Sequence, residues 1–187
     1  MKSKKTREKI LDVSLQLFNE KKASNVSTVQ ISAAMKISPG NLYYYFANKE
    51  EVIRCLWRER MLDEIEHLTG RIREVTDCEE LYTLVNECFD HYEKYMFFYS
   101  ETATLFANDP ELGELYDARL EASIEDVRAF IARWISEGRM ADMTEDREKV
   151  LAENIILLMK AQFTGLGSYN GDRRSNILAV IDSCIIR

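Results

Sequence analysis

The 187-residue chain is long enough for one domain, or for a small module joined to a larger one, and its 46% hydrophobic content allows a substantial core. Because it holds only 7 Gly and 2 Pro, long helices are favoured over a sheet with many turns. The longest uncharged run, residues 23–35, is too short to span a bilayer, and the basic start leads into an amphipathic stretch rather than a signal peptide, so we expect a cytoplasmic protein.

The net charge of −7 is distributed unevenly along the chain. Residues 1–54 carry ten Lys/Arg and five Asp/Glu, a balance of +5, whereas the remaining residues carry fifteen and twenty-seven, a balance of −12. A basic N-terminal quarter joined to an acidic body predicts an end that faces DNA.

The first predicted helix carries an apolar stripe at 3.6-residue spacing, formed by Ile10, Val13 and Leu17 with Leu11 and Phe18 beside it. Thr6 is its expected cap, and the helix is expected to end near residues 20–22. The basic arm from Lys2 to Arg7 is expected to add non-specific affinity for DNA, which a steeper salt dependence would reveal.

Two short helices follow and form a helix-turn-helix pattern. Ser27 to Gln30 has the Ser-x-x-Gln form of a capping box and opens a helix that reaches about Met35, with Ile31, Ala34 and Met35 expected to face inward. After a tight turn at residues 36–37, Ser38 caps a third helix, with Pro39 at the first helical position. A further capping box at residues 48–51 opens a fourth helix that runs toward residue 68.

The body is predicted to be helical and rich in aromatic residues. A capping box at residues 77–80 opens a helix over 81–96, and Asp109 caps a long helix from Pro110 to about Gly138. Thr144 is the expected cap of a helix over residues 145–163. Asp172 is expected to start the last helix, which ends at Ile186.

The N-terminal residues resemble a known family. Leu17-Phe-Asn-Glu-Lys21, residues 27–34, Ile37-Ser-Pro-Gly-Asn-Leu-Tyr-Tyr-Tyr-Phe46 and Asn48-Lys-Glu-Glu51 together resemble the DNA-binding domain of tetracycline-repressor (TetR) family regulators. The resemblance implies an all-α protein, with a three-helix helix-turn-helix DNA-binding domain over residues 1–47 and a larger helical effector-binding and dimerisation domain over residues 48–187. This chain has Lys22 and Lys36 where the family usually has Gly, and a left-handed conformation there costs roughly 1 kcal/mol.

The proposed contacts with DNA fall into two groups. The N-terminal end of a recognition helix meets base edges in the major groove, which here places Ser38, Pro39, Gly40 and Asn41 against bases. The resemblance implies that Tyr43 and Tyr44 contact phosphates, and helix starts favour phosphate at Thr28 and Lys49. Val29 is a candidate contact to a thymine methyl, but it is equally well a bystander, and Tyr44 is alternatively a solvent-exposed residue. Leu42, Tyr45 and Phe46 share one face and are assigned to packing.

The body is expected to form a homodimer and to bind a ligand. Residues 155–159 are apolar on every face of a helix, which requires burial on several sides, and the last helix offers a matching apolar surface. The resemblance implies that the last two helices of each copy form a four-helix bundle around the two-fold axis. It also implies a cavity for a small, apolar effector, and our candidate lining residues are Phe89, Tyr92, Met96, Phe130, Trp134 and Phe163. Aromatic residues at helical spacing are, however, more often core than pocket.

Other chemistry finds little support in the sequence. His67 and His91 lie on different predicted helices with no third ligand evident, so we expect no metal and no cofactor. No Ser-His-Asp, Cys-His or Gly-rich phosphate motif is present, so we do not expect an enzyme. The four cysteines have no metal-ligand spacing and are interpreted as small apolar residues, with a redox switch as the alternative. The sequence therefore predicts a homodimeric transcriptional repressor that binds double-stranded DNA at a palindromic operator and is released from it by a small molecule. The alternative is a DNA-binding dimer without an effector.

Overall fold

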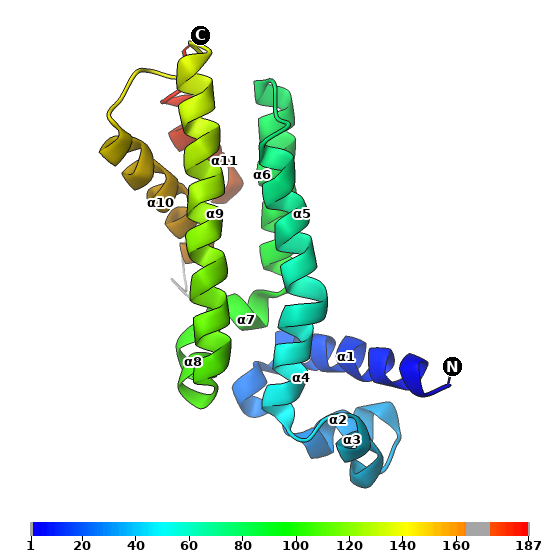
Figure 1. The fold of residues 1–187 in the computed structure, drawn as a ribbon. Coiled ribbons are helices and arrows are strands. Elements are labelled where there is room, and N and C mark those ends of the chain that lie inside the picture. The colour runs from blue at the N-terminus through cyan, green and yellow to red at the C-terminus, as the bar shows by residue number, and fades with distance from the viewer. Residues whose placement is uncertain (1, 164–172, 187) are drawn as a thin grey trace. The chain divides into compact units, whose positions relative to one another are not determined.

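The computed structural model describes residues 2–163 and 173–186, with side chains for residues 4–163 and 174–186. Within these ranges the regular elements are helices (Figure 1). One isolated bridge pairs Met140 with Ile185. The all-α prediction is confirmed. The chain divides into two compact units: a first unit of residues 1–64 and 95–113, and a second unit of residues 65–94 and 114–187. The predicted boundary between residues 47 and 48 stays a prediction; the first unit contains more than the helix-turn-helix.

The first unit begins with four helices in the order that the sequence predicts. These are α1 (Lys2–Lys21), α2 (Thr28–Met35), α3 (Pro39–Tyr45) and α4 (Lys49–Leu56), with the short 3-10 helix η1 (Ala23–Asn25) between α1 and α2. The helix after α4 is not uniform: a π-helical segment, η2 (Trp57–Met61), separates α4 from α5 (Leu62–Ile72). The unit is completed by α7 (Met96–Ser100) and α8 (Thr102–Asn108), which were not predicted.

Side-chain caps set the start of three of these helices. The Ser27 hydroxyl accepts a hydrogen bond from the backbone of Gln30, whose side chain accepts one from the backbone of Ser27, so the predicted capping box is confirmed. Ser38 caps α3 and Asn48 caps α4 by accepting one bond each, from the backbone of Asn41 and of Glu51; the Glu51 side chain accepts from the backbone of Ala47 rather than of Asn48, so the predicted box at residues 48–51 is only half formed. Each cap satisfies a helix donor that would otherwise lack a partner, so the α2–turn–α3 geometry is encoded locally.

Two expectations for this region are wrong. The helix α1 begins at Lys2 and not after Thr6, so the residues expected to form a basic arm belong to the helix. Arg7 within it is already engaged, because its guanidinium lies 5.1 Å from the ring centre of Phe46 and pairs with Glu59. Ala34 is exposed, because Ser32 and Ile31 are the residues of α2 that reach the core.

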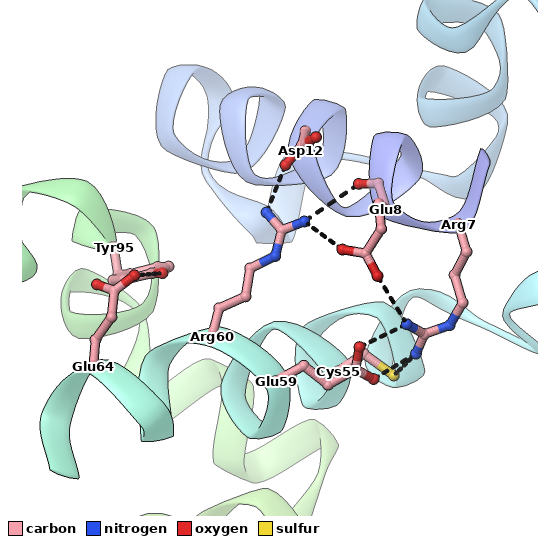
Figure 2. Close-up of polar contacts among 8 residues, drawn as sticks. All are labelled: Arg7, Glu8, Asp12, Cys55, Glu59, Arg60, Glu64 and Tyr95. Carbon is pink, nitrogen blue, oxygen red and sulfur yellow. Dashed lines mark hydrogen bonds and ion pairs between the residues drawn. The ribbon is translucent and has the colours of Figure 1, made fainter. Parts of the chain in front are cut away.

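Two arginines join α1 to the segment that follows α4 (Figure 2). Arg7 of α1 donates to both carboxylate oxygens of Glu59, at 2.5 and 2.6 Å. Arg60 of η2 donates to Asp12 at 2.6 Å and to the Glu8 carboxylate at 3.2 Å. The hydrogen bonds from Arg7 lower the pKa of Glu59 below its ordinary value, since they favour the ionised carboxylate. These pairs fix α1 on a helix about fifty residues away in the sequence.

In the part of the second unit that the structure describes, the later part of α5 is joined by four more helices. These are α6 (Cys78–Lys94), α9 (Pro110–Ser136, of which the first turn belongs to the first unit), α10 (Glu145–Ala161) and α11 (Arg173–Asp182). Asp77 and Asp109 accept the predicted capping bonds, whereas Thr144 occupies the cap position of α10 without one. The helix α6 ends at Lys94, two residues before the predicted end, and Asp172 lies outside the described residues. None of the described helices combines the length and apolar character needed to cross a membrane.

Candidate nucleic-acid interface

The start of α3 presents its first turn to solvent. Ser38, Pro39, Gly40 and Asn41 are all exposed, and the Ser38 hydroxyl accepts from the backbone of Asn41 at 3.2 Å. A Cβ atom added to Gly40 would meet no atom within 4 Å. The fold itself therefore does not require a glycine at this position. A glycine would be required if another molecule packed closely against the backbone of this turn.

The three consecutive tyrosines have different surroundings. Tyr43 is 51% exposed and Tyr44 is 76% exposed, whereas Tyr45 is half-buried and meets the Tyr44 ring edge-on at 5.0 Å. Leu42 and Phe46 are buried in the core of the first unit. The helix therefore anchors one face and leaves the Tyr43 and Tyr44 side chains exposed, as its spacing predicts. Val29, on α2, is also exposed.

An open groove of about 440 Å³ lies beside these exposed residues. Three residues assigned to phosphates line it, namely Thr28, Tyr43 and Lys49, and the hydroxyl groups of Thr28 and Tyr43 lie 3.0 Å apart. The rest of the lining comes from the α1–α2 linker, the α3–α4 turn and the first turn of α4: Ser24, Asn25, Val26, Ser27, Ala47, Asn48 and Glu50. Hydroxyl groups, an ammonium and helix starts are donors for an anion, so this groove has the chemistry of a phosphate site.

Lys49 has a role in the fold that the sequence did not reveal. Its Nζ donates to the carbonyl oxygen of Ala23 at 2.7 Å, which ties the start of α4 to the α1–α2 linker. An ammonium group has three donors, so a phosphate could still accept from Lys49 without breaking this bond. The carboxylate of Glu50 also lines the groove and opposes an anion there.

The six candidate ligand residues do not form one cluster. Phe89, Tyr92 and Phe163 come together in the second unit: the Tyr92 and Phe163 rings stack at 5.3 Å, and Phe89 lies 6.0 Å from Phe163. Phe130 and Trp134 form a separate ring pair at 4.7 Å on α9. Met96 belongs to the first unit and is 43% exposed.

Two residues that the sequence analysis missed join the Tyr92 group. The ammonium of Lys160 lies 4.5 Å from the centre of the Tyr116 ring. Desolvation lowers the pKa of Lys160. Desolvation raises the pKa values of Tyr92 and Tyr116, and the proximity of Tyr116 contributes to that of Tyr92. Phe130 follows Tyr116 by fourteen residues, which is about 21 Å along a helix, so the two ring groups lie far apart on α9. We refer to Phe89, Tyr92, Tyr116, Lys160 and Phe163 as the aromatic cluster.

Comparison with known families identifies the chain. Residues 10–55 match the model described as "Bacterial regulatory proteins, tetR family", and residues 59–173 match the model described as "Bacterial transcriptional repressor". The second match alone covers more than half of the chain. The chain belongs to the TetR family. It is therefore a DNA-binding transcriptional regulator of the helix-turn-helix type, and α2 and α3 lie within the residues that match the first model.

Individual TetR-family proteins are similar over different lengths. The HTH-type transcriptional regulator AcrR of Shigella flexneri is 32% identical over 66 residues, which is 34% of this chain and 31% of that protein. The crystal structure of a TetR-family regulator from Marinobacter aquaeolei superposes with a TM-score of 0.81 and 25% identity, covering 95% of this chain and 86% of that one. A putative transcriptional regulator from Saccharomonospora viridis, solved in complex with choline, has a TM-score of 0.79 at 17% identity, covering 98% of this chain and all of that one.

Proposed function

We propose that the protein is a homodimeric repressor that binds a palindromic operator and is released from it by a small molecule. The observation that carries the proposal is the outward-facing first turn of α3 beside the groove that gathers Thr28, Tyr43 and Lys49. In this arrangement Ser38 to Asn41 read base edges, while the groove residues and Tyr44 hold phosphates. Val29 lies exposed at the start of α2 and is assigned to a thymine methyl.

The proposed dimer uses α10 and α11. Val150, Leu157 and Leu158 are large apolar residues of α10 that remain exposed in a single copy, and the first two lie seven residues apart on one stripe. Ile177 and Ile181 of α11 are buried, and α11 contacts α10. A second copy packed on the exposed stripe would remove it from water. Two copies related by a two-fold axis would present two recognition helices to successive major grooves.

The proposed effector is a small molecule with a mainly apolar surface. The aromatic cluster supports this proposal, because stacked rings bind flat or apolar groups, and its tyrosine hydroxyls and Lys160 offer a few polar contacts. The similar protein from Saccharomonospora viridis binds choline, a cation of the kind that aromatic faces bind. Ligand binding would favour a subunit arrangement in which the recognition helices no longer match the DNA.

The DNA half of the proposal is tested by selection from a random duplex library. We expect the protein to enrich an inverted repeat whose half-sites lie about one helical turn apart. Asn41→Ala is expected to relax the base preference within each half-site, since Asn can bond bidentately to adenine. If no duplex is enriched, or if the enriched duplex has no two-fold symmetry, the proposed function is wrong.

The effector half is tested separately, and it distinguishes the repressor from a DNA-binding dimer without an effector. A thermal-shift screen of apolar metabolites, with choline chloride included, is expected to find a compound that raises the melting temperature and releases the selected duplex. Phe163→Ala removes one ring of the stack and is expected to reduce both effects. If no compound releases the DNA, the alternative dimer is favoured.

A further inference from the structure

The linker between α1 and α2 is held by a side chain from a distant part of the first unit. The Glu101 carboxylate, between α7 and α8, accepts hydrogen bonds from the backbone of Ala23 at 2.5 Å and of Ser24 at 3.3 Å. Glu101 is only 8% exposed. Two neighbouring amides that point at one carboxylate form a small anion-binding nest, and here the protein fills the nest with its own side chain. Lys22 adopts a φ of 67° immediately before this nest, where the chain leaves α1.

The same linker is hydrogen-bonded to the candidate phosphate groove. The carbonyl oxygen of Ala23 accepts from Lys49 Nζ at 2.7 Å, and residues 24–28 and Lys49 line the groove. The backbone N–H of Ala23 therefore donates to Glu101, and the carbonyl oxygen of the same residue accepts from Lys49. A shift of the linker would move both the Lys49 ammonium and the turn that leads to Thr28.

We propose that Glu101 is a positioning residue for DNA binding: it fixes the Lys22–Asn25 linker and thereby places Lys49 and Thr28 to receive a DNA phosphate. This inference rests on the proposed function, in which the groove takes phosphates. Glu101 lies in the stretch that matches the second family model, whereas the linker lies in the stretch that matches the first. A group from residues 95–113 thus completes a surface that residues 10–55 alone would leave less constrained.

The carboxylate suits this role better than an amide. A carboxylate only accepts hydrogen bonds, so its two oxygens can satisfy two N–H groups at once. In Glu101→Gln the amide oxygen can satisfy one N–H, but the NH₂ group would face the other donor. Burial of Ala23 and Val26 would still hold the linker near its place, so the variant is expected to change the position of Lys49 more than the fold.

The test measures binding of a fluorescent duplex, enriched by the wild-type protein, over a range of salt concentrations. Glu101→Gln is expected to weaken binding about tenfold and to reduce the slope of log K against log salt by about one, the value of one lost phosphate contact. The matched control is Glu114→Gln, which removes the same charge from an exposed position of α9 and is expected to change neither quantity. Lys49→Met is expected to weaken binding similarly, and adding Glu101→Gln to it is expected to cause little further loss.

Each outcome decides one part of the proposal. If the wild-type protein enriches a duplex but Glu101→Gln binds it with unchanged affinity or an unchanged salt slope, the role of Glu101 is wrong and the proposed function stands. An additive effect of the two substitutions would also overturn the positioning role. If the wild-type protein enriches no duplex, the proposed function fails and this inference fails with it. If Glu101→Gln does not fold, Glu101→Asp, which keeps the charge but shortens the reach, must show the same loss of slope.

Discussion

The hydroxyl groups of Thr28 and Tyr43 lie 3.0 Å apart, so the first turn of α2 and the exposed face of α3 share a hydrogen bond across fifteen residues of sequence. The pair lines the groove that lies beside α3. Each hydroxyl can donate one hydrogen bond and accept others, so a phosphate oxygen could accept from either group while the pair stays together. One hydroxyl donates to the other, so the pair holds one free O–H, supplied by either group, ready for an anion before DNA binds.

Removal of either hydroxyl should weaken operator binding with little effect on stability. Tyr43→Phe and Thr28→Val are each expected to reduce affinity for the selected duplex about tenfold, because one hydrogen bond to a charged group is worth roughly 1.5 kcal/mol. The melting temperature is expected to change little, since Tyr43 is half-exposed. A double-mutant cycle, measured by fluorescence anisotropy, is expected to show coupling of about 0.5 kcal/mol or more. Full additivity would show that the two hydroxyls do not act on one phosphate.

Gly40 should have opposite effects on stability and on DNA binding. Gly40→Ala is expected to raise the free energy of unfolding by about 0.5 kcal/mol, because alanine favours helix and a Cβ has open space there. The same Cβ would hold the backbone of α3 away from the bases, and affinity for the selected duplex is expected to fall severalfold. Gly70→Ala in α5 also has open space and serves as the control; it is expected to stabilise without changing DNA affinity. Tighter DNA binding by Gly40→Ala would contradict the docking of this turn against DNA.

The Arg7–Glu59 pair should make stability depend on pH in the acid range. Because the hydrogen bond from Arg7 lowers the pKa of Glu59 in the folded protein, the pair stabilises above the ordinary carboxyl pKa of about 4.3, and this contribution is lost as the pH falls through the lowered value. Glu59→Gln is therefore expected to cost about 1 kcal/mol at pH 7, discounted for its exposed surroundings, and progressively less below about pH 4. Urea unfolding at a series of pH values measures the difference. The Glu114→Gln control is expected to show no such trend, and a constant cost for Glu59→Gln down to pH 2 would contradict the ion-pair account.

Local chemistry explains what the sequence predicted well. Ser27, Ser38 and Asn48 act on backbone groups three residues away, so each helix start could be predicted from a short pattern. The spacing of Leu42, Tyr45 and Phe46 likewise predicted which face of α3 is anchored. The family resemblance supplied the two-part architecture, which no local pattern contains.

Contacts between distant segments explain what was missed. Glu101 meets the linker at a separation of 78 residues, and nothing in its neighbours indicates that partner. Arg7 was assigned to a basic arm together with the N-terminal lysines, whereas it lies in α1 and contacts Glu59 and Phe46. The spacing of aromatic residues predicts which face of a helix is buried. It does not predict at which level along the helix axis each ring meets the neighbouring helices, so Phe130 and Phe163 were assigned to one pocket although their rings belong to separate groups.

The exposed apolar stripe of α10 predicts how the oligomeric state should respond to a charge. Leu157 is 53% exposed in one copy, and Leu157→Glu would place a carboxylate at the centre of the proposed interface, where an unpaired charge is strongly unfavourable. The variant is expected to run as a monomer in size-exclusion chromatography with light scattering, and to lose most of its affinity for the inverted repeat while it keeps weak affinity for a single half-site. Ala118→Glu, at an exposed position of α9, is the control and is expected to leave the dimer intact. A Leu157→Glu protein that remains dimeric and binds the inverted repeat normally would show that the two copies associate through another surface.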